Sequence, residues 1–204
     1  MSGMGRKLCR LAAPLAWAVL ALPLYSANPL LLMVGPPGSG RSTQAGLLSK
    51  DLGIPVVSVE DLIARNPGKF PKKLPSASTL ADPRLEPVMN DLVSEALRAA
   101  DLSKGVVLDG YPATKAQGDF LQSIRAKHGL PAPIVIQLNA PDDVVRKRLK
   151  GQSRDIEQEI KDYHREFDFI TTYFPQADIR TVDATKKPAQ VAKEIRKSLA
   201  TAGK

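Results

Sequence analysis

The chain has 204 residues, of which 43% are hydrophobic and 25% are charged, and its formal net charge is +8. That length and hydrophobic content suffice for one α/β domain with a substantial core. The basic balance suits anionic ligands, but no basic–aromatic stripe or long lysine/arginine run supports nucleic-acid binding. One cysteine and two histidines that are far apart in sequence argue against disulfide, thiol or histidine-based metal chemistry.

Residues 1–27 have a different character from the rest of the chain. Three basic residues lie within the first ten positions, residues 11–24 are apolar, and Tyr25-Ser26-Ala27 follows. This order is typical of a secretory signal, and the apolar stretch is shorter than a membrane span requires. The pattern predicts a signal peptide or, if it is not cleaved, an N-terminal membrane anchor. The protein is then exported to the periplasm or secreted, or is anchored at a membrane; a wrongly assigned start and a cytoplasmic protein are the alternative.

The next segment is the most informative one in the sequence. An apolar run, Leu30–Val34, predicts a strand, and it leads into Gly35-Pro36-Pro37-Gly38-Ser39-Gly40-Arg41-Ser42-Thr43 and a helix over Arg41–Leu52. This is the phosphate-binding pattern G-x-x-x-x-G-K-[ST], with Arg41 in place of the lysine. Glycines allow backbone N–H groups to surround an anion, and the helix adds its positive N-terminal end. The segment therefore predicts a phosphate site.

Beyond it, short apolar runs alternate with amphipathic segments, a pattern that indicates a parallel sheet with crossover helices. Further strands are predicted over 55–58, 106–108, 134–138 and 180–183. Further helices are predicted over 59–65, 83–100, 115–128, 141–150, 154–173 and 188–200, with Asp82 as N-cap and Pro83 as first residue of the second of these. Residues 66–81 are predicted to form a loop. The expected fold is a doubly wound α/β P-loop domain over residues 28–204.

A second motif follows the predicted strand over 106–108. It begins with Asp109-Gly110-Tyr111-Pro112 and continues to Thr114 and Gln117. An aspartate at the carboxyl end of a second buried strand is where a P-loop protein holds Mg²⁺, directly or through water. Asp109 and Gly110 alone also suit a simple turn.

Together these segments resemble the adenylate kinase family of nucleoside monophosphate kinases. The family's G-x-P-G-x-G-K-G-T-Q loop is similar to residues 35–44, and its D-G-F-P-R-T-x-x-Q motif is similar to residues 109–117. Its S-T-G-D-L-L-R segment resembles residues 58–64. The resemblance runs in the same order from about residue 30 to residue 200 and implies a short lid near residues 151–154.

The resemblance implies ATP and Mg²⁺ as cofactors and AMP or a related monophosphate as acceptor, in a protein that we expect to be a monomer. The donor phosphates would be bound by Gly35, Pro37, Gly38, Ser39, Gly40, Arg41, Ser42 and Thr43. Mg²⁺ would be held by Ser42 and Asp109. The acceptor would be bound by Asp61, Arg65, Gly110, Tyr111, Pro112 and Gln117. Catalytic roles would fall to Arg41, Asp109, Arg148 and Arg154.

The family's arginines are largely missing from this site. Ala113 and Ala64 replace two of them, Gln152 and Tyr163 are predicted to replace two more, and Arg65 is a possible substitute for the arginine lost at Ala64. Each arginine that contacts a transferring phosphoryl group contributes on the order of 10³-fold or more in rate. Two main hypotheses follow: a nucleoside monophosphate kinase with altered or reduced activity, and a non-catalytic nucleotide-binding or interaction protein. A third hypothesis is a P-loop kinase that acts on a different small acceptor.

Overall fold

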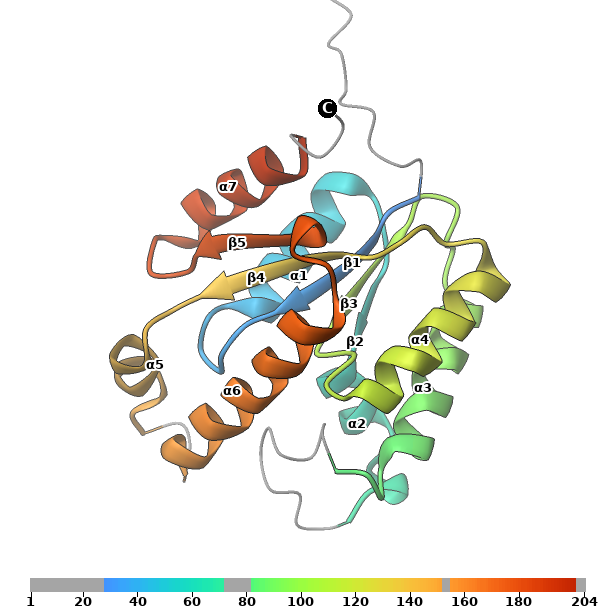
Figure 1. The fold of residues 1–204 in the computed structure, drawn as a ribbon, viewed down its shortest axis with the longest axis horizontal. Helices are drawn as coiled ribbons and strands as arrows, with labels where there is room; N and C mark the ends of the chain where they lie inside the picture. Colours follow the sequence, from blue (N-terminus) through green and yellow to red (C-terminus); the bar gives the residue numbers. More distant parts are fainter. Residues whose placement is uncertain (1–27, 72–81, 152–154, 201–204) are drawn as a thin grey trace, which may run out of the picture.

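A computed structural model describes residues 28–71, 82–151 and 155–200. Within these ranges five strands form one sheet: β1 (Leu30–Val34), β2 (Val56–Ser58), β3 (Val106–Asp109), β4 (Ile134–Asn139) and β5 (Ile179–Asp183). Their order is β2-β3-β1-β4-β5 and every neighbouring pair is parallel (Figure 1). The predicted doubly wound α/β fold is confirmed.

Seven α-helices lie among the described residues. They are α1 (Arg41–Leu52), α2 (Val59–Arg65), α3 (Glu86–Ala99), α4 (Lys115–His128), α5 (Asp142–Leu149), α6 (Ile156–Tyr173) and α7 (Pro188–Ala200). Two short 3₁₀ helices, η1 (Pro67–Lys69) and η3 (Gln176–Asp178), lie after α2 and before β5. None of the helices in this part of the chain has the length and apolar character needed to cross a membrane.

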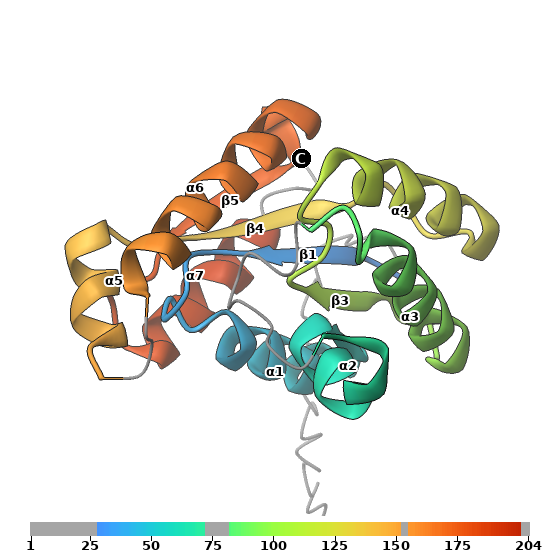
Figure 2. The same ribbon diagram turned by 90° about the horizontal axis from the view of Figure 1, so that it is seen from below.

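Strand β1 is the centre of the core, and all five of its residues are buried. Its side chains alternate between the faces of the sheet. Leu30 and Leu32 pack on the side covered by α3, α4 and α6, while Leu31 and Met33 pack on the side covered by α1 and α7. Figure 2 shows the sheet between these two layers. Burial on both faces explains why the strand is a continuous apolar run.

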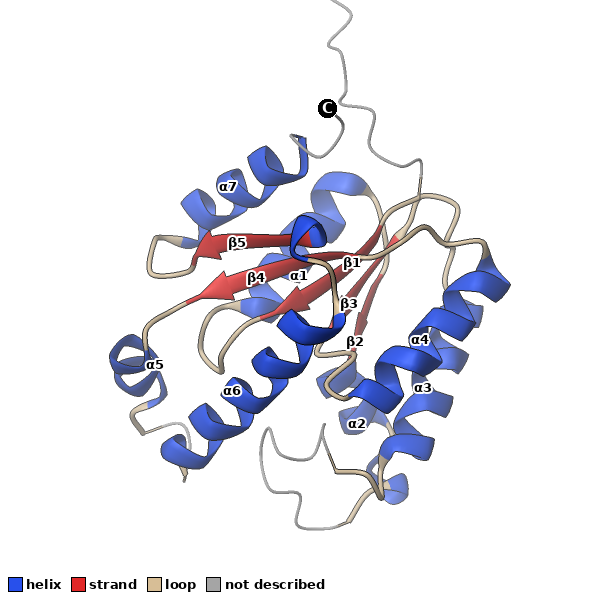
Figure 3. Ribbon diagram, in the orientation of Figure 1, coloured by secondary structure: helices blue, strands red, loops and turns tan. Residues whose placement is uncertain are grey.

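Because all five strands are parallel, their carboxyl ends meet at one edge of the sheet (Figure 3). The central strand is in register with Leu32 opposite both Leu108 of β3 and Val135 of β4. The loop after β1 therefore lies beside the end of β3. This is the point at which the order of successive strands across the sheet reverses. In open α/β sheets this is where ligands bind.

The predicted start of the third long helix was wrong. The sequence predicts Asp82 as the N-cap and Pro83 as the first helical residue. In the structure, residues 83–85 form a turn and α3 begins at Glu86. Asp82 Oδ1 accepts a hydrogen bond from the Arg84 N–H within this turn, at 3.0 Å. A helix that began at Pro83 would place Pro87 in its interior, where proline removes a hydrogen bond and clashes with the carbonyl four residues earlier. Starting at Glu86 places Pro87 in the first turn, where it is tolerated.

The helix predicted from Arg154 begins at Ile156. Asp155 is its N-cap, and its side chain accepts the Gln158 N–H at 3.1 Å. Arg154 and Gln152, which the sequence places in the short lid, lie outside the described residues, as do residues 1–27.

Candidate active site

The loop between β1 and α1 is built closely around its glycines. A Cβ on Gly35 would lie 2.7 Å from Ser39 Oγ and 2.9 Å from Leu138 Cβ, so a side chain does not fit there. Gly40 has φ of 89°, in the left-handed region that favours glycine. These two positions require glycine, and the sequence supplies it at both.

The N-terminus of α1 is open to an anion. Gly40 is the N-cap and provides no side chain to accept the first N–H groups of this twelve-residue helix. Ser42 and Thr43 are exposed in the first turn, and the buried Ser39 Oγ has no hydrogen-bond partner among the described residues. Free N–H groups, hydroxyls and a positive helix end suit a phosphate group. The residues predicted to bind the donor phosphates are therefore brought together in one place.

Arg41 does not extend freely from this loop. Its Nε lies 2.8 Å from Asp109 Oδ1 at the end of β3, and its Nη2 donates to Glu60 Oε1 of α2 at 3.1 Å. The Asp109 side chain is 2% exposed and that of Arg41 is 14% exposed. Burial disfavours the charge on Arg41, but the carboxylates of Glu166, Asp109 and Glu60 outweigh it and raise the pKa of the guanidinium. The loop's basic residue is thus paired with acidic side chains from two elements, and the charge of a third acidic side chain acts on it.

Glu166 of α6 is part of this cluster, and the sequence analysis did not identify it. Burial raises the pKa of its carboxyl; the charge of Arg41 acts in the opposite direction, and the charge of Asp109 raises the pKa further. Its Oε1 is buried and has no hydrogen-bond partner among the described residues. A signal was available, because Glu166 lies three residues after Tyr163 and seven after Glu159, on the face of α6 that packs inward.

Tyr163 lies on the same face of α6. Its side chain is buried, and burial raises the pKa of its hydroxyl to about 12. The charges of Arg41 and Glu166 both act on this hydroxyl, which places it near the loop. Where the sequence predicts that an arginine has been lost, the structure therefore has an uncharged phenol beside the cluster.

Arg148 connects the phosphate loop to the segment that follows β5. Its Nη1 donates to the Gly38 carbonyl at 3.0 Å, and its Nη2 donates to the Ala184 carbonyl at 2.8 Å. It borders a cavity of about 260 Å³ between the loop, α1 and the segment that leads into α7. The cavity is lined by Gly38, Ser39, Gly40, Thr43, Gln44, Arg148, Ala184, Lys186, Pro188 and Val191. The cavity lies directly next to the phosphate loop.

The motif after β3 forms a compact and buried turn. The Tyr111–Pro112 peptide bond is cis, and the Tyr111 hydroxyl donates to Asn90 Oδ1 at 2.6 Å. Gln117 Oε1 accepts the N–H of Ala113 at 2.7 Å, and Thr114 caps α4. Ala113 is 4% exposed. In this structure the Gln117 amide oxygen is committed to the turn itself.

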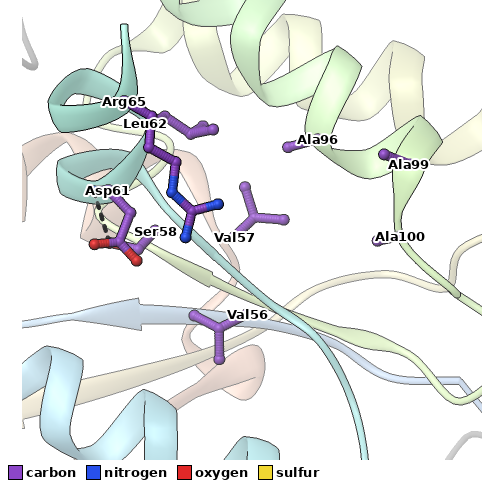
Figure 4. Close-up of a pocket in the computed structure, with 9 residues that line it drawn as sticks. All are labelled: Val56, Val57, Ser58, Asp61, Leu62, Arg65, Ala96, Ala99 and Ala100. Carbon is purple, nitrogen blue, oxygen red and sulfur yellow. Dashed lines mark hydrogen bonds between the residues drawn. The ribbon is translucent and has the colours of Figure 1, made fainter. Parts of the chain in front are cut away.

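Asp61 and Arg65 lie elsewhere on α2. The Asp61 N–H donates to the N-cap Ser58 Oγ at 3.4 Å, and the Asp61 side chain is exposed. Figure 4 shows Arg65 reaching over a groove of about 250 Å³ between β2, α2 and α3. The residues that line it are Val56, Val57, Ser58, Asp61, Leu62, Arg65, Ala96, Ala99 and Ala100. Asp61 and Arg65 thus border the same groove, whereas the other predicted acceptor residues, Gly110, Tyr111, Pro112 and Gln117, do not line it.

Asp109 and Ser42 suit a magnesium ion that is also bound by water and substrate phosphates. They do not form a complete metal site made of protein ligands alone. Asp109 Oδ2 is buried and without a hydrogen-bond partner in the described part of the chain, and the Ser42 side chain is exposed. No group of three or more metal-ligating side chains occurs among the described residues. Mg²⁺ is usually held by one or two protein oxygens together with water and substrate phosphates. The donor set agrees with that form of binding.

A phosphate loop after β1, an aspartate at the end of β3 and the strand order β2-β3-β1-β4-β5 define a P-loop protein of the nucleoside monophosphate kinase type. A family model described as adenylate kinase matches residues 33–179. The chain belongs to the adenylate kinase family.

Individual relatives agree with this assignment. The chain is 33% identical over 181 residues to an adenylate kinase from Mycolicibacterium vanbaalenii, covering 83% of this chain and 98% of the relative. It is 31% identical over 164 residues to an adenylate kinase from Pseudarthrobacter chlorophenolicus, with coverage of 74% and 85%. An adenylate kinase from Brucella anthropi is 29% identical over 195 residues, with coverage of 84% and 99%. Family membership supports the function of a nucleoside monophosphate kinase.

Proposed function

We propose that the protein transfers the γ-phosphoryl group of ATP to AMP or a related monophosphate, with Mg²⁺ as cofactor and with reduced activity. In this reaction the bond between the γ-phosphorus and the β–γ bridging oxygen breaks, and a new bond forms to a phosphate oxygen of the acceptor. The observation that carries the proposal is the open N-terminus of α1, with exposed Ser42 and Thr43, beside Asp109 at the end of β3.

Within this proposal each group has a distinct task. The loop N–H groups and the hydroxyls bind the donor phosphates, and Arg148 holds the loop next to the cavity for the base. Asp109 and Ser42 would hold Mg²⁺, which neutralises charge on the phosphate oxygens when it is bound. Phosphoryl transfer depends mainly on such positioning and charge neutralisation.

The reduced rate follows from what surrounds the transferred group. Ala64 and Ala113 bring no charge, and the cation of Arg41 is shared among Asp109, Glu60 and Glu166. A site with fewer free cations stabilises the charge of the transition state less well. We expect a turnover several orders of magnitude below that of an arginine-rich site.

The test is a coupled assay with ATP, Mg²⁺ and a panel of nucleoside monophosphates, using Arg41→Ala as the control. Transfer to at least one monophosphate at a rate above the control supports the proposal. Equal rates in both proteins contradict it.

The second hypothesis is a nucleotide-binding protein without turnover. The acidic cluster around Arg41 favours this second hypothesis, because its carboxylates form ion pairs with the guanidinium that a kinase would direct at phosphate. Calorimetric titration with ATP and with AMP separates the two hypotheses. Binding without turnover supports the second, and the absence of binding contradicts both.

A further inference from the structure

The phosphate pocket of the loop has an acidic residue in its wall. This cavity of about 200 Å³ is lined by Pro36, Pro37, Gly38, Gly40, Arg41, Ser42, Thr43 and Glu60. The first seven belong to the loop or to the first turn of α1, and Glu60 comes from α2. A phosphate group that enters this cavity therefore meets a carboxylate as well as the positive end of a helix.

Glu60 is held in this position by Arg41 itself. Arg41 Nη2 lies 3.1 Å from Glu60 Oε1, while Arg41 Nε contacts Asp109 on the buried side. The Glu60 side chain is 67% exposed and the Arg41 side chain only 14%. Such a half-exposed ion pair contributes little to stability, so Glu60 can leave Arg41 at little cost.

The backbone of α2 directs Glu60 at the loop. Strand β2 ends at Ser58, whose side chain caps α2 by accepting the Asp61 N–H, and Glu60 is the second residue of the helix. In the family segment S-T-G-D-L-L-R the corresponding position is glycine, which has no side chain to reach the loop. The carboxylate in the pocket wall is therefore a property of this chain and not of the general pattern.

We propose that Glu60 is a specificity-determining residue that competes with nucleotide phosphate for Arg41. A bound triphosphate must displace Glu60 from Arg41 or accept its negative charge nearby. Free ATP carries more negative charge than ATP complexed with Mg²⁺, so Glu60 penalises the free nucleotide more strongly. The loop thereby selects the metal-complexed triphosphate. This inference rests on the proposed binding of ATP phosphates at the loop.

The experiment compares the unmodified protein with Glu60→Gln, Glu60→Ala and the control Glu95→Gln. Glu95 is an exposed glutamate on α3 and undergoes the same change of charge away from the loop. Calorimetry measures the Kd of ATP at constant ionic strength, once with excess Mg²⁺ and once with EDTA. Inorganic tripolyphosphate serves as a second probe that has no base. Thermal unfolding of each variant verifies that it is folded.

We expect both Glu60 variants to bind ATP about 3- to 10-fold more tightly than the unmodified protein, which corresponds to about 1 kcal/mol. The gain should be larger in EDTA than in Mg²⁺, and it should also occur with tripolyphosphate. Glu95→Gln should change the Kd by less than about twofold, because its charge is screened at that distance.

Three results overturn the proposal in distinguishable ways. If the unmodified protein binds ATP and the Glu60 variants bind it equally or more weakly, Glu60 does not compete, and the proposed function stands. A gain of the same size in Glu95→Gln would show a general effect of net charge. If neither the unmodified protein nor the Glu60 variants bind ATP with or without Mg²⁺, the proposed function fails, and the role of Glu60 fails with it.

Discussion

The guanidinium Nε of Arg41 lies 2.8 Å from Asp109 Oδ1, and this ion pair joins the start of α1 to the end of β3. In the P-loop pattern the basic residue contacts the bound phosphates and the aspartate helps to hold the metal. Here they contact each other directly, with Glu166 and Glu60 beside them. The ion pair therefore affects the stability of the fold as well as the charge that the loop offers to a bound phosphate, and each effect can be measured separately.

Arg41→Met should destabilise the fold markedly. The substitution leaves the carboxylates of Asp109 and Glu166 buried without their cation, and removing one partner of a buried ion pair costs about 3–5 kcal/mol. Urea unfolding at neutral pH measures the loss. Arg41→Lys keeps the charge and should cost clearly less. Equal stability of Arg41→Met and the unmodified protein would show that the cluster is solvated and not buried.

Glu166→Gln should stabilise the protein at neutral pH and have little effect in acid. Because burial raises the pKa of Glu166 in the folded state, folding is favoured when this group is protonated. The pKa of Glu166 in the unfolded chain is near 4.5. The unmodified protein therefore loses stability as the pH rises above this value and through the higher pKa of Glu166 in the folded state. The amide removes this loss, so the two unfolding curves should differ at pH 7 and converge below about pH 4.5. A constant difference at all pH values would contradict the assignment.

The fold was predictable because its signals are local and strong. Each predicted strand agrees with the structure to within one residue, since runs such as Leu30–Val34 are buried on both faces and read as uniformly apolar. The start of α3 was not predicted, because Pro83 and Pro87 both suit a first turn and only one can occupy it. Choosing between them required the exclusion of proline from a helix interior.

The site was predictable only in part. The glycine loop and Asp109 follow from the pattern, since the register of β1 and β3 brings their carboxyl ends together. The electrostatic interactions of Arg41 with Glu60 and Glu166 join residues 19 and 125 positions away, and no local pattern encodes them. Arg65 is adjacent to Ala64 in sequence, but one helical step turns it toward the groove beside β2.

Residues 1–27 are predicted to export or anchor the protein. Expression of the full chain in a bacterial host, followed by fractionation, tests this prediction. Mass spectrometry of the mature N-terminus should show a start near residue 27 or 28, or the intact chain should be found in the membrane fraction. Deletion of residues 11–24 should return the protein to the cytoplasm. An intact Met1 in the cytoplasm of the undeleted protein would contradict the prediction.

Arg148→Ala should weaken ATP binding and lower stability by about 1–3 kcal/mol, because two charged hydrogen bonds to backbone carbonyls are lost. Arg148→Lys should recover little, since an ammonium cannot span both Gly38 and Ala184. The matched control is Arg146→Ala on the same helix, whose pair with Glu157 is exposed and therefore contributes little to stability. Calorimetry and urea unfolding measure the two effects. An equal loss in both alanine variants would show that Arg148 acts only through its charge.

Ala64→Arg should increase phosphoryl transfer to AMP, because it restores a cation at the position where the family segment has arginine. Ala64 is exposed on α2, so the longer side chain can be accommodated without disturbing the core. Arginines that contact a transferring phosphoryl group raise the rate on the order of 10³-fold or more, and a partial increase of about tenfold is the minimum we expect.

Ala99→Arg is the control, since it adds the same charge at an exposed position on α3 beside the groove that holds Arg65. Initial rates with saturating ATP and Mg²⁺ over a range of AMP concentrations separate effects on KM from effects on kcat. A lower KM with unchanged kcat would place the new arginine on the bound acceptor alone, whereas a higher kcat would place it on the transferring group. If both variants leave kcat and KM unchanged, charge at position 64 does not limit the reaction.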